Sequence, residues 1–224
     1  KSGILKFFLI YFFLYEKIKK LVKLIFYIFC FLSKKTININ YLIKRGDAVA
    51  NLILKSEVYN LKQSKDIKNT KFKFLPEGRY NVPNYRVFTI RDGIVKAGTN
   101  SIFSSEGRKI TNINFQESPF DLDFIFGIKN IKLDFFHGSL LVLGVGLIEK
   151  NYSHAWTELA ARAYATVLSK LKYEGILIDY DTKFVREILS LIGLPENKII
   201  FSKNYGYIKA TKLIYPELIN NYNE

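Results

Sequence analysis

His154, Glu158 and Arg162 have side chains whose types and spacing suit acid–base chemistry. Their i, i+4 and i+8 spacing would place all three on one face of an α-helix. His154 would lie in the first turn, where the positive end of the helix dipole disfavours a charged imidazolium. A neutral imidazole can take a proton from a substrate hydroxyl near neutral pH. Glu158 would then orient the ring, and Arg162 would balance Glu158 or bind an anionic group.

The same spacing also fits an ordinary surface helix. Charged pairs at i, i+4 are common on helices, and an exposed Glu–Arg pair stabilises a helix by only ~0.3–0.5 kcal/mol. From the spacing alone, both interpretations stay open.

The elements that must position this segment alternate between strand and helix. We expect a strand at 139–145, a helix at 153–171 and a strand at 176–178. A second helix at 182–192 follows, and then two strands at 198–201 and 207–215. Ser153 is the expected N-cap of the first helix, Gly175 its breaker, and Gly193 and Pro195 the stop of the second. This alternation predicts a parallel sheet with right-handed crossovers. Ligands on such sheets bind beyond the carboxyl ends of the strands, where residues 151–158 fall.

A longer ordered pattern surrounds the segment. Its residues are Asn151, Tyr152, His154, Glu158 and Arg162, then Phe184, Arg186, Leu191, Gly193, Leu194, Pro195 and Lys198. In order and spacing, the run from about residue 137 to 213 resembles the family 61 glycosyltransferases, whose bacterial members are often labelled capsular polysaccharide biosynthesis proteins. Two positions depart from the family pattern: Ala155 occupies the usual tryptophan position, with Trp156 one place later, and Ala161 replaces a proline.

The resemblance implies inverting transfer of a sugar from a nucleotide-sugar donor to an acceptor hydroxyl. The implied fold is α/β, a Rossmann-like N-terminal half of the two-domain GT-B architecture, on the side that handles the acceptor. Direct displacement requires a base, for which His154 is the first choice and Glu158 the second. The resemblance also implies substrate binding by Asn151, Tyr152 and Arg162. No cofactor or metal site is assigned, and dependence on a divalent metal is left open.

The chain ends at Glu224, where the second Rossmann domain of the family would begin, and it contains no methionine. We therefore expect a fragment that is inactive alone because it lacks the donor half. The expected parts are an amphipathic helix at 1–40, a helix and basic linker at 41–84, and the acceptor-side domain at 85–224. Within these parts we expect a helix at 41–58 and a lysine-rich connector at 60–73. The acceptor-side domain should begin with a small antiparallel β layer, with strands at 86–91, 93–97, 100–104 and 109–115 and hairpin signals at Asp92-Gly93 and Glu106-Gly107.

The formal net charge of +14 is concentrated near the N-terminus. Sixteen basic and four acidic residues lie before residue 74, which leaves the rest of the chain nearly neutral. On a helix at 4–32 the charged residues would fall within an arc of roughly 160°, opposite a wholly apolar side. Such a helix lies in the membrane interface, and neither apolar half reaches the ~20 residues of a spanning helix. We expect association with the cytoplasmic face of a membrane, with a buried core helix as the alternative.

Other signals are weaker. The single cysteine excludes an internal disulfide and favours a reducing compartment, and two histidines give no zinc set. The Asp179-x-Asp181 pair imitates a metal motif, but a helix-capping role for Asp181 is the more ordinary interpretation. No nucleic-acid partner is expected, because the basic residues do not alternate with aromatics. The rival to an enzyme is a non-catalytic, membrane-associated scaffold built on a degenerate glycosyltransferase half-domain.

Overall fold

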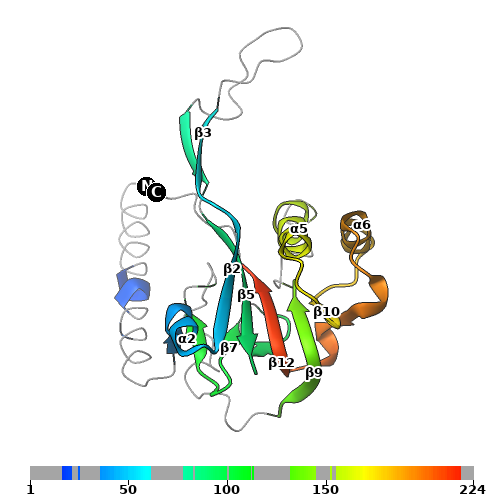
Figure 1. Cartoon of the computed structure of the whole chain (residues 1–224). Helices are drawn as coiled ribbons and strands as arrows, with labels where there is room; N and C mark the ends of the chain where they lie inside the picture. Colours follow the sequence, from blue (N-terminus) through cyan, green and yellow to red (C-terminus); the bar gives the residue numbers. More distant parts are fainter. Residues whose placement is uncertain are drawn as a thin grey trace, which may run out of the picture.

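The structure of the chain is a computed structural model that describes residues 17–21, 25, 36–61, 78–82, 84–99, 101–111, 113, 132–144, 152 and 155–217. Among these residues, ten strands form one mixed sheet and two further strands form a separate ribbon. The strands of the sheet are β1 (Thr36–Asn38), β2 (Ala48–Leu54), β5 (Tyr85–Arg91), β6 (Ile94–Lys96), β7 (Ile102–Phe103), β8 (Lys109–Thr111), β9 (Asp134–Val142), β10 (Gly175–Ile178), β11 (Ile199–Phe201) and β12 (Tyr207–Pro216). The ribbon pairs β3 (Glu57–Leu61) with β4 (Gly78–Val82) and extends away from the sheet (Figure 1).

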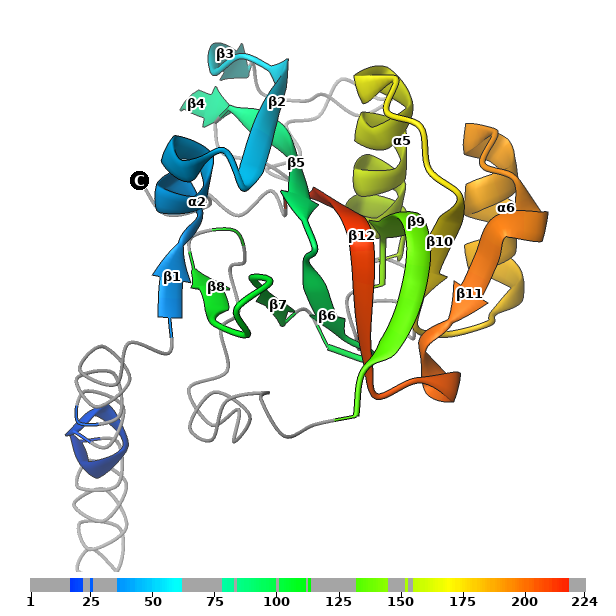
Figure 2. The same cartoon turned by 60° about the horizontal axis from the view of Figure 1, so that its bottom comes forward.

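The parallel half of the sheet has the strand order β12-β9-β10-β11. The π-helix η2 (Ala155–Leu159) and α5 (Ala160–Ser169) connect β9 to β10, and α6 (Lys183–Ile192) connects β10 to β11. After β11 the chain returns to the other side of β9 to form β12 (Figure 2). The strand order therefore reverses between β9 and β12. The predicted α/β class and the predicted parallel strands are confirmed.

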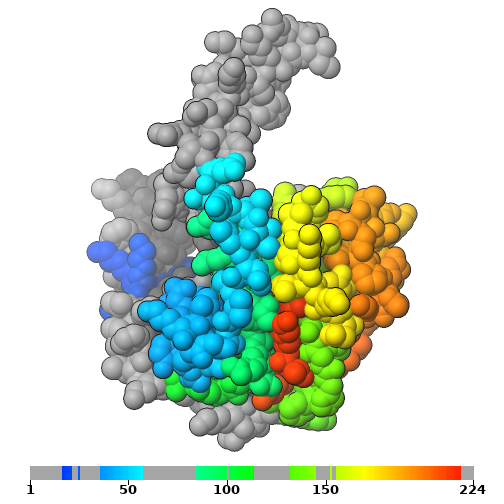
Figure 3. All heavy atoms as spheres, in the orientation of Figure 1, coloured from blue at the N-terminus to red at the C-terminus, as the bar shows by residue number. Residues whose placement is uncertain are grey.

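Two apolar cores lie on opposite faces of the sheet. Successive residues of β9 alternate between them: Leu140 and Val142 pack on the side of α2 (Ile39–Arg45), whereas Leu141 faces α5 and α6. This is the alternation that a strand buried on both faces requires. In the space-filling view, α5 and α6 form one flank of the molecule and α2 another (Figure 3).

The strands at 85–111 do not form a separate antiparallel layer, which corrects the sequence-based expectation. β5 and β6 both pair with β12, so they extend the sheet that holds the parallel half. Asp92-Gly93 is a bend between these two strands and not a hairpin turn. Gly93 is needed there because a Cβ atom would lie 2.9 Å from the Cβ atom of Leu213. The other hairpin signal is confirmed, since β7 and β8 pair across Glu106-Gly107.

The expected helix at 41–58 is also wrong in its extent. Asn38 caps α2 by accepting a hydrogen bond from the backbone N–H of Asn40 at 2.8 Å, and Gly46 ends the helix with φ +77°. The chain then turns into β2, which pairs with β5. The apolar residues at 48–54 have helical spacing, but pairing with β5 makes this segment a strand. Most of the expected connector at 60–73 lies outside the described residues.

Local signals predicted α6 well. Thr182 accepts a hydrogen bond from the backbone N–H of Val185, and Gly193 ends the helix with φ +83°. The end of α5 was predicted less well, because it stops at Ser169 with Lys170 in the left-handed conformation. Gly175 instead begins β10, where a Cβ atom would lie 2.6 Å from Cζ of Phe136.

The apolar residues of the first βα unit do not form one buried stripe. Leu159 and Ala163 are buried, whereas Tyr164, Val167 and Leu168 are exposed. The buried side of α5 carries small and polar residues, with Arg162 among them.

Near the N-terminus, residues 17–21 and 25 are helical. Ile18, Leu21 and Ile25 are each more than half exposed. No helix within the described part of the chain is long and apolar enough to cross a membrane.

Candidate functional site at the carboxyl edge of the parallel strands

The candidate site lies where the strand order reverses, at the ends of β9 and β12. In open α/β sheets this is the place where ligands bind. Leu143 and Gly144 follow β9, and Glu217 follows β12. The predicted site residues Asn151 and His154 fall in the segment between β9 and η2 and lie outside the described residues, as does the expected N-cap Ser153.

A π-helix leads away from this segment. Its i→i+5 hydrogen bonds make a wider turn than an α-helix, and such turns often occur at functional sites. η2 spans Ala155–Leu159 and continues directly into α5. The wider turn changes the phase between residues on its two sides, so the assumed 100° per residue does not hold through the segment. Glu158 accordingly stays partly exposed while Arg162 is directed into the protein and is only 1% exposed.

Arg162 joins the ends of the two strands that flank the reversal. Its Nη1 and Nη2 donate to the carbonyl oxygens of Leu143 and Val142, each at 2.9 Å. Its Nε donates to the carbonyl oxygen of Pro216 at 3.1 Å. The guanidinium also lies over the ring of Tyr215, 4.8 Å from its centroid. Three of the five N–H groups of this arginine are therefore held by backbone, and the side chain braces the carboxyl edge.

Two buried tyrosines surround this guanidinium. Burial raises the pKa of Tyr85 and of Tyr215, while the positive charge of Arg162 opposes the shift in both. Glu217 adds to both increases in pKa, although it is itself paired with Arg86 through two hydrogen bonds of 2.6 and 2.9 Å. Within the described residues, the hydroxyl oxygen of Tyr85 has no hydrogen-bond partner.

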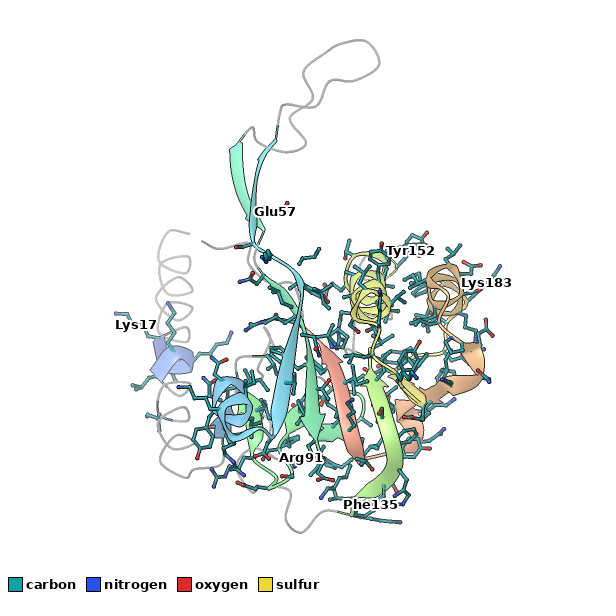
Figure 4. The ribbon with its side chains drawn as sticks, viewed as in Figure 1. Lys17, Glu57, Arg91, Phe135, Tyr152 and Lys183 are labelled. Atoms are coloured by element: carbon teal, nitrogen blue, oxygen red, sulfur yellow. The ribbon has the colours of Figure 1, made fainter. Side chains whose placement is uncertain are left out.

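An aromatic corner bridges the helices that follow β9 and β10. We use this name for Tyr152, Trp156 and Phe184. The ring centroids of Tyr152 and Trp156 are 6.3 Å apart at 68°, and those of Tyr152 and Phe184 are 5.7 Å apart at 76°. Tyr152 is 61% exposed and Trp156 is 39% exposed. Tyr152 lies at the same end of the molecule as Lys183, the first residue of α6 (Figure 4).

Sequence reasoning missed this grouping. Tyr152 and Phe184 were noted only as separate members of a linear pattern. The available signal was the presence of aromatic residues after two neighbouring parallel strands, whose carboxyl ends lie at one edge.

Asp179 and Asp181 both have protein partners. Asp179 is buried, and its Oδ1 accepts a hydrogen bond from the backbone N–H of Gly98 at 3.1 Å. Asp181 accepts from Arg186 Nε at 2.5 Å and Nη2 at 2.9 Å, and these hydrogen bonds lower the pKa of Asp181. Thr182, and not Asp181, caps α6, which corrects the expected role of Asp181. In the described part of the chain, no three histidine, cysteine or acidic side chains cluster as metal ligands would.

Comparison of the chain with protein-family models, with curated proteins and with solved structures finds no match. What can be said of function therefore rests on the residues and on the geometry of this edge.

Proposed function

We propose that the chain is the acceptor-side part of an inverting glycosyltransferase. It would transfer a sugar from a nucleotide-sugar donor to an acceptor hydroxyl, in the synthesis of a surface polysaccharide or another glycan. The observation that carries the proposal is the reversal of strand order between β9 and β12. In the sequence, Asn151 and His154 stand between Gly144, which follows β9, and the first residue of the π-helix η2.

Each residue of the site has a proposed role. His154 takes the proton of the acceptor hydroxyl as that oxygen attacks the anomeric carbon, and Glu158 orients the imidazole or replaces it as the base. Asn151 and Tyr152 contact the substrate. For Arg162 the sequence predicted substrate binding. Because its side chain is buried and binds the carbonyl groups at the ends of β9 and β12, its proposed role is instead to support the site.

The proposed partners are a nucleotide-sugar, a carbohydrate acceptor and the cytoplasmic face of a membrane, contacted through residues 4–32. The exposed side chains of Ile18, Leu21 and Ile25 support membrane contact, because three apolar groups at helical spacing need a partner of low polarity. Flotation with liposomes that contain anionic lipid tests this part. The intact chain should float and a chain without residues 4–32 should not.

Transfer is tested on the longest reading frame that contains residues 1–224. The assay measures release of nucleoside diphosphate from a panel of nucleotide-sugars in the presence of glycoside acceptors. His154→Ala should abolish release, because the acceptor hydroxyl then loses its base. His137→Ala, the matched change at the other histidine, should leave it unchanged. Full activity of His154→Ala would refute the proposal that His154 is the base.

A non-catalytic scaffold is the second candidate. It is favoured by the hydrogen bonds that polar side chains at the edge make within the protein, because these donors and acceptors are then used by the fold. Arg162 binds backbone carbonyl groups, and Asp181 binds Arg186. A scaffold would release no nucleoside diphosphate from any donor, and its reading frame would contain no second nucleotide-binding domain.

A further inference from the structure

The aromatic corner is an open surface and not a packed core. Phe184 is half-buried and holds Tyr152 from the side of α6, whereas Tyr152 and Trp156 keep much of their surface in solvent. Aromatic rings left exposed at the ligand-binding edge of a parallel sheet offer a surface for a partly apolar ring.

The angles between the rings select the shape of that ligand. The neighbouring pairs meet at 68° and 76°, so they form a corner and not a parallel slot. A flat nucleobase gains most from rings parallel to its own plane. A pyranose chair is thicker than a nucleobase. Its axial C–H groups can pack on the face of one aromatic ring while its edge makes dispersion contacts with the second ring.

Polar groups next to the corner suit the hydroxyls of such a ring. Lys183 precedes Phe184 in the chain and its side chain is almost fully exposed. Glu158 lies in the same π-helix as Trp156 and is partly exposed. A ligand with an apolar face and a hydroxylated edge matches this combination of aromatic walls and charged neighbours.

We propose that the aromatic corner binds the pyranose ring of the acceptor. The proposal rests on the proposed function, because it is the acceptor that must lie beside the base. His154 stands between Tyr152 and Trp156 in the sequence, so the proposed base belongs to the same short segment as two of the three aromatic residues. Tyr152, Trp156 and Phe184 would then determine which acceptor rings are accepted.

Binding can be measured without catalysis. Trp156 is the only tryptophan of the chain, so intrinsic tryptophan fluorescence reports on the corner alone. The intact chain is titrated with the methyl pyranosides of glucose, galactose and N-acetylglucosamine, and separately with uridine. At least one glycoside should change the emission of Trp156 in a saturable way, and uridine should not.

Variants locate the binding surface. Tyr152→Ala and Phe184→Ala should each weaken the glycoside by about three- to tenfold, because each removes one aromatic contact. Tyr152→Phe keeps the ring and should bind as the native chain does. Phe135→Ala is the matched control, since Phe135 is 65% exposed and lies at the opposite end of the sheet from Tyr152 (Figure 4).

Several outcomes would overturn the proposal. They are the absence of any response to the three glycosides, a response to uridine alone, or an equal loss of affinity in Phe135→Ala. The transfer assay separates this result from the proposed function. If transfer occurs but Tyr152→Ala leaves the acceptor KM unchanged, the corner proposal fails and the transferase stands. If the glycoside binds at the corner but no donor is consumed, the binding site stands and the transferase fails.

Discussion

Replacing Arg162 by methionine should lower the free energy of unfolding by about 3–5 kcal/mol, the balance between three lost hydrogen bonds from a charged donor and the relieved desolvation of that charge. Methionine is unbranched and replaces the aliphatic part of the arginine side chain but not its guanidinium, so the change removes the donors and keeps much of the packing. It deprives the carbonyl groups of Val142, Leu143 and Pro216 of a charged donor. The ends of β9 and β12 would then lose the side chain that joins them.

The magnitude follows from two opposing effects. Each hydrogen bond from a charged donor stabilises the folded state by roughly 1.5–3 kcal/mol, and a buried acceptor left without a partner destabilises it by about 1–3 kcal/mol. Removing a buried positive charge also relieves its desolvation, which offsets part of the three lost bonds. The net loss is large beside the roughly 5–15 kcal/mol that typically stabilise a domain.

Urea unfolding monitored by circular dichroism measures the difference. Arg162→Lys keeps the charge but not the planar fork, so its stability should fall between those of the native protein and Arg162→Met. Arg186→Met is the control, because that guanidinium pairs with Asp181 on the surface and its loss should change little. If Arg162→Met unfolds within about 0.5 kcal/mol of the native protein, as a surface change would, the bracing role is refuted.

Two further predictions concern Tyr85 and Gly175. Tyr85→Phe should leave stability at pH 7 unchanged or raise it by up to about 1–3 kcal/mol, because the buried hydroxyl has no hydrogen-bond partner within the described residues. The folded state raises the pKa of Tyr85 above the ordinary 10.0, so the unfolded chain loses this proton first as the pH rises. The free energy of unfolding should therefore be independent of this group below about pH 10 and fall above it. In urea unfolding at a series of pH values, Tyr85→Phe should show a smaller fall than the native protein. An equally steep fall in the variant would contradict the raised pKa of Tyr85. Gly175→Ala should destabilise by about 1–3 kcal/mol in thermal unfolding, because its Cβ atom would lie 2.6 Å from Phe136 and 2.9 Å from Ile200. Gly206→Ala meets no atom within 4 Å and should have no such effect, and equal melting temperatures for the two variants would contradict the predicted overlap.

Elements fixed by neighbouring residues could be predicted from the sequence. Gly193 ends α6 where the sequence predicted, and the short apolar run at 176–178 forms most of β10. Asp92-Gly93 misled the prediction because a hairpin and a bend share the same residue types. Which of them forms depends on β12, which is distant in the chain and pairs with both β5 and β6.

The arrangement of the site depended on contacts that spacing does not encode. Arg162 binds carbonyl groups 19, 20 and 54 positions away, so no local pattern shows that its guanidinium is buried. The π-helix changes the phase of the helix between Glu158 and Arg162, and helical-wheel reasoning assumes that no such change occurs. Tyr152 and Phe184 belong to different βα units and meet only because their strands are neighbours.

The most direct test compares two pH titrations of His154. The chain has two histidines, so NMR with a His137→Ala variant as reference assigns the imidazole signals of His154. The pH dependence of kcat/KM for sugar transfer is then measured on the same reading frame. We predict that the acidic limb of the rate profile has the same midpoint as the titration of His154, since only the neutral ring accepts the proton. Transfer that is independent of pH through that midpoint would contradict it.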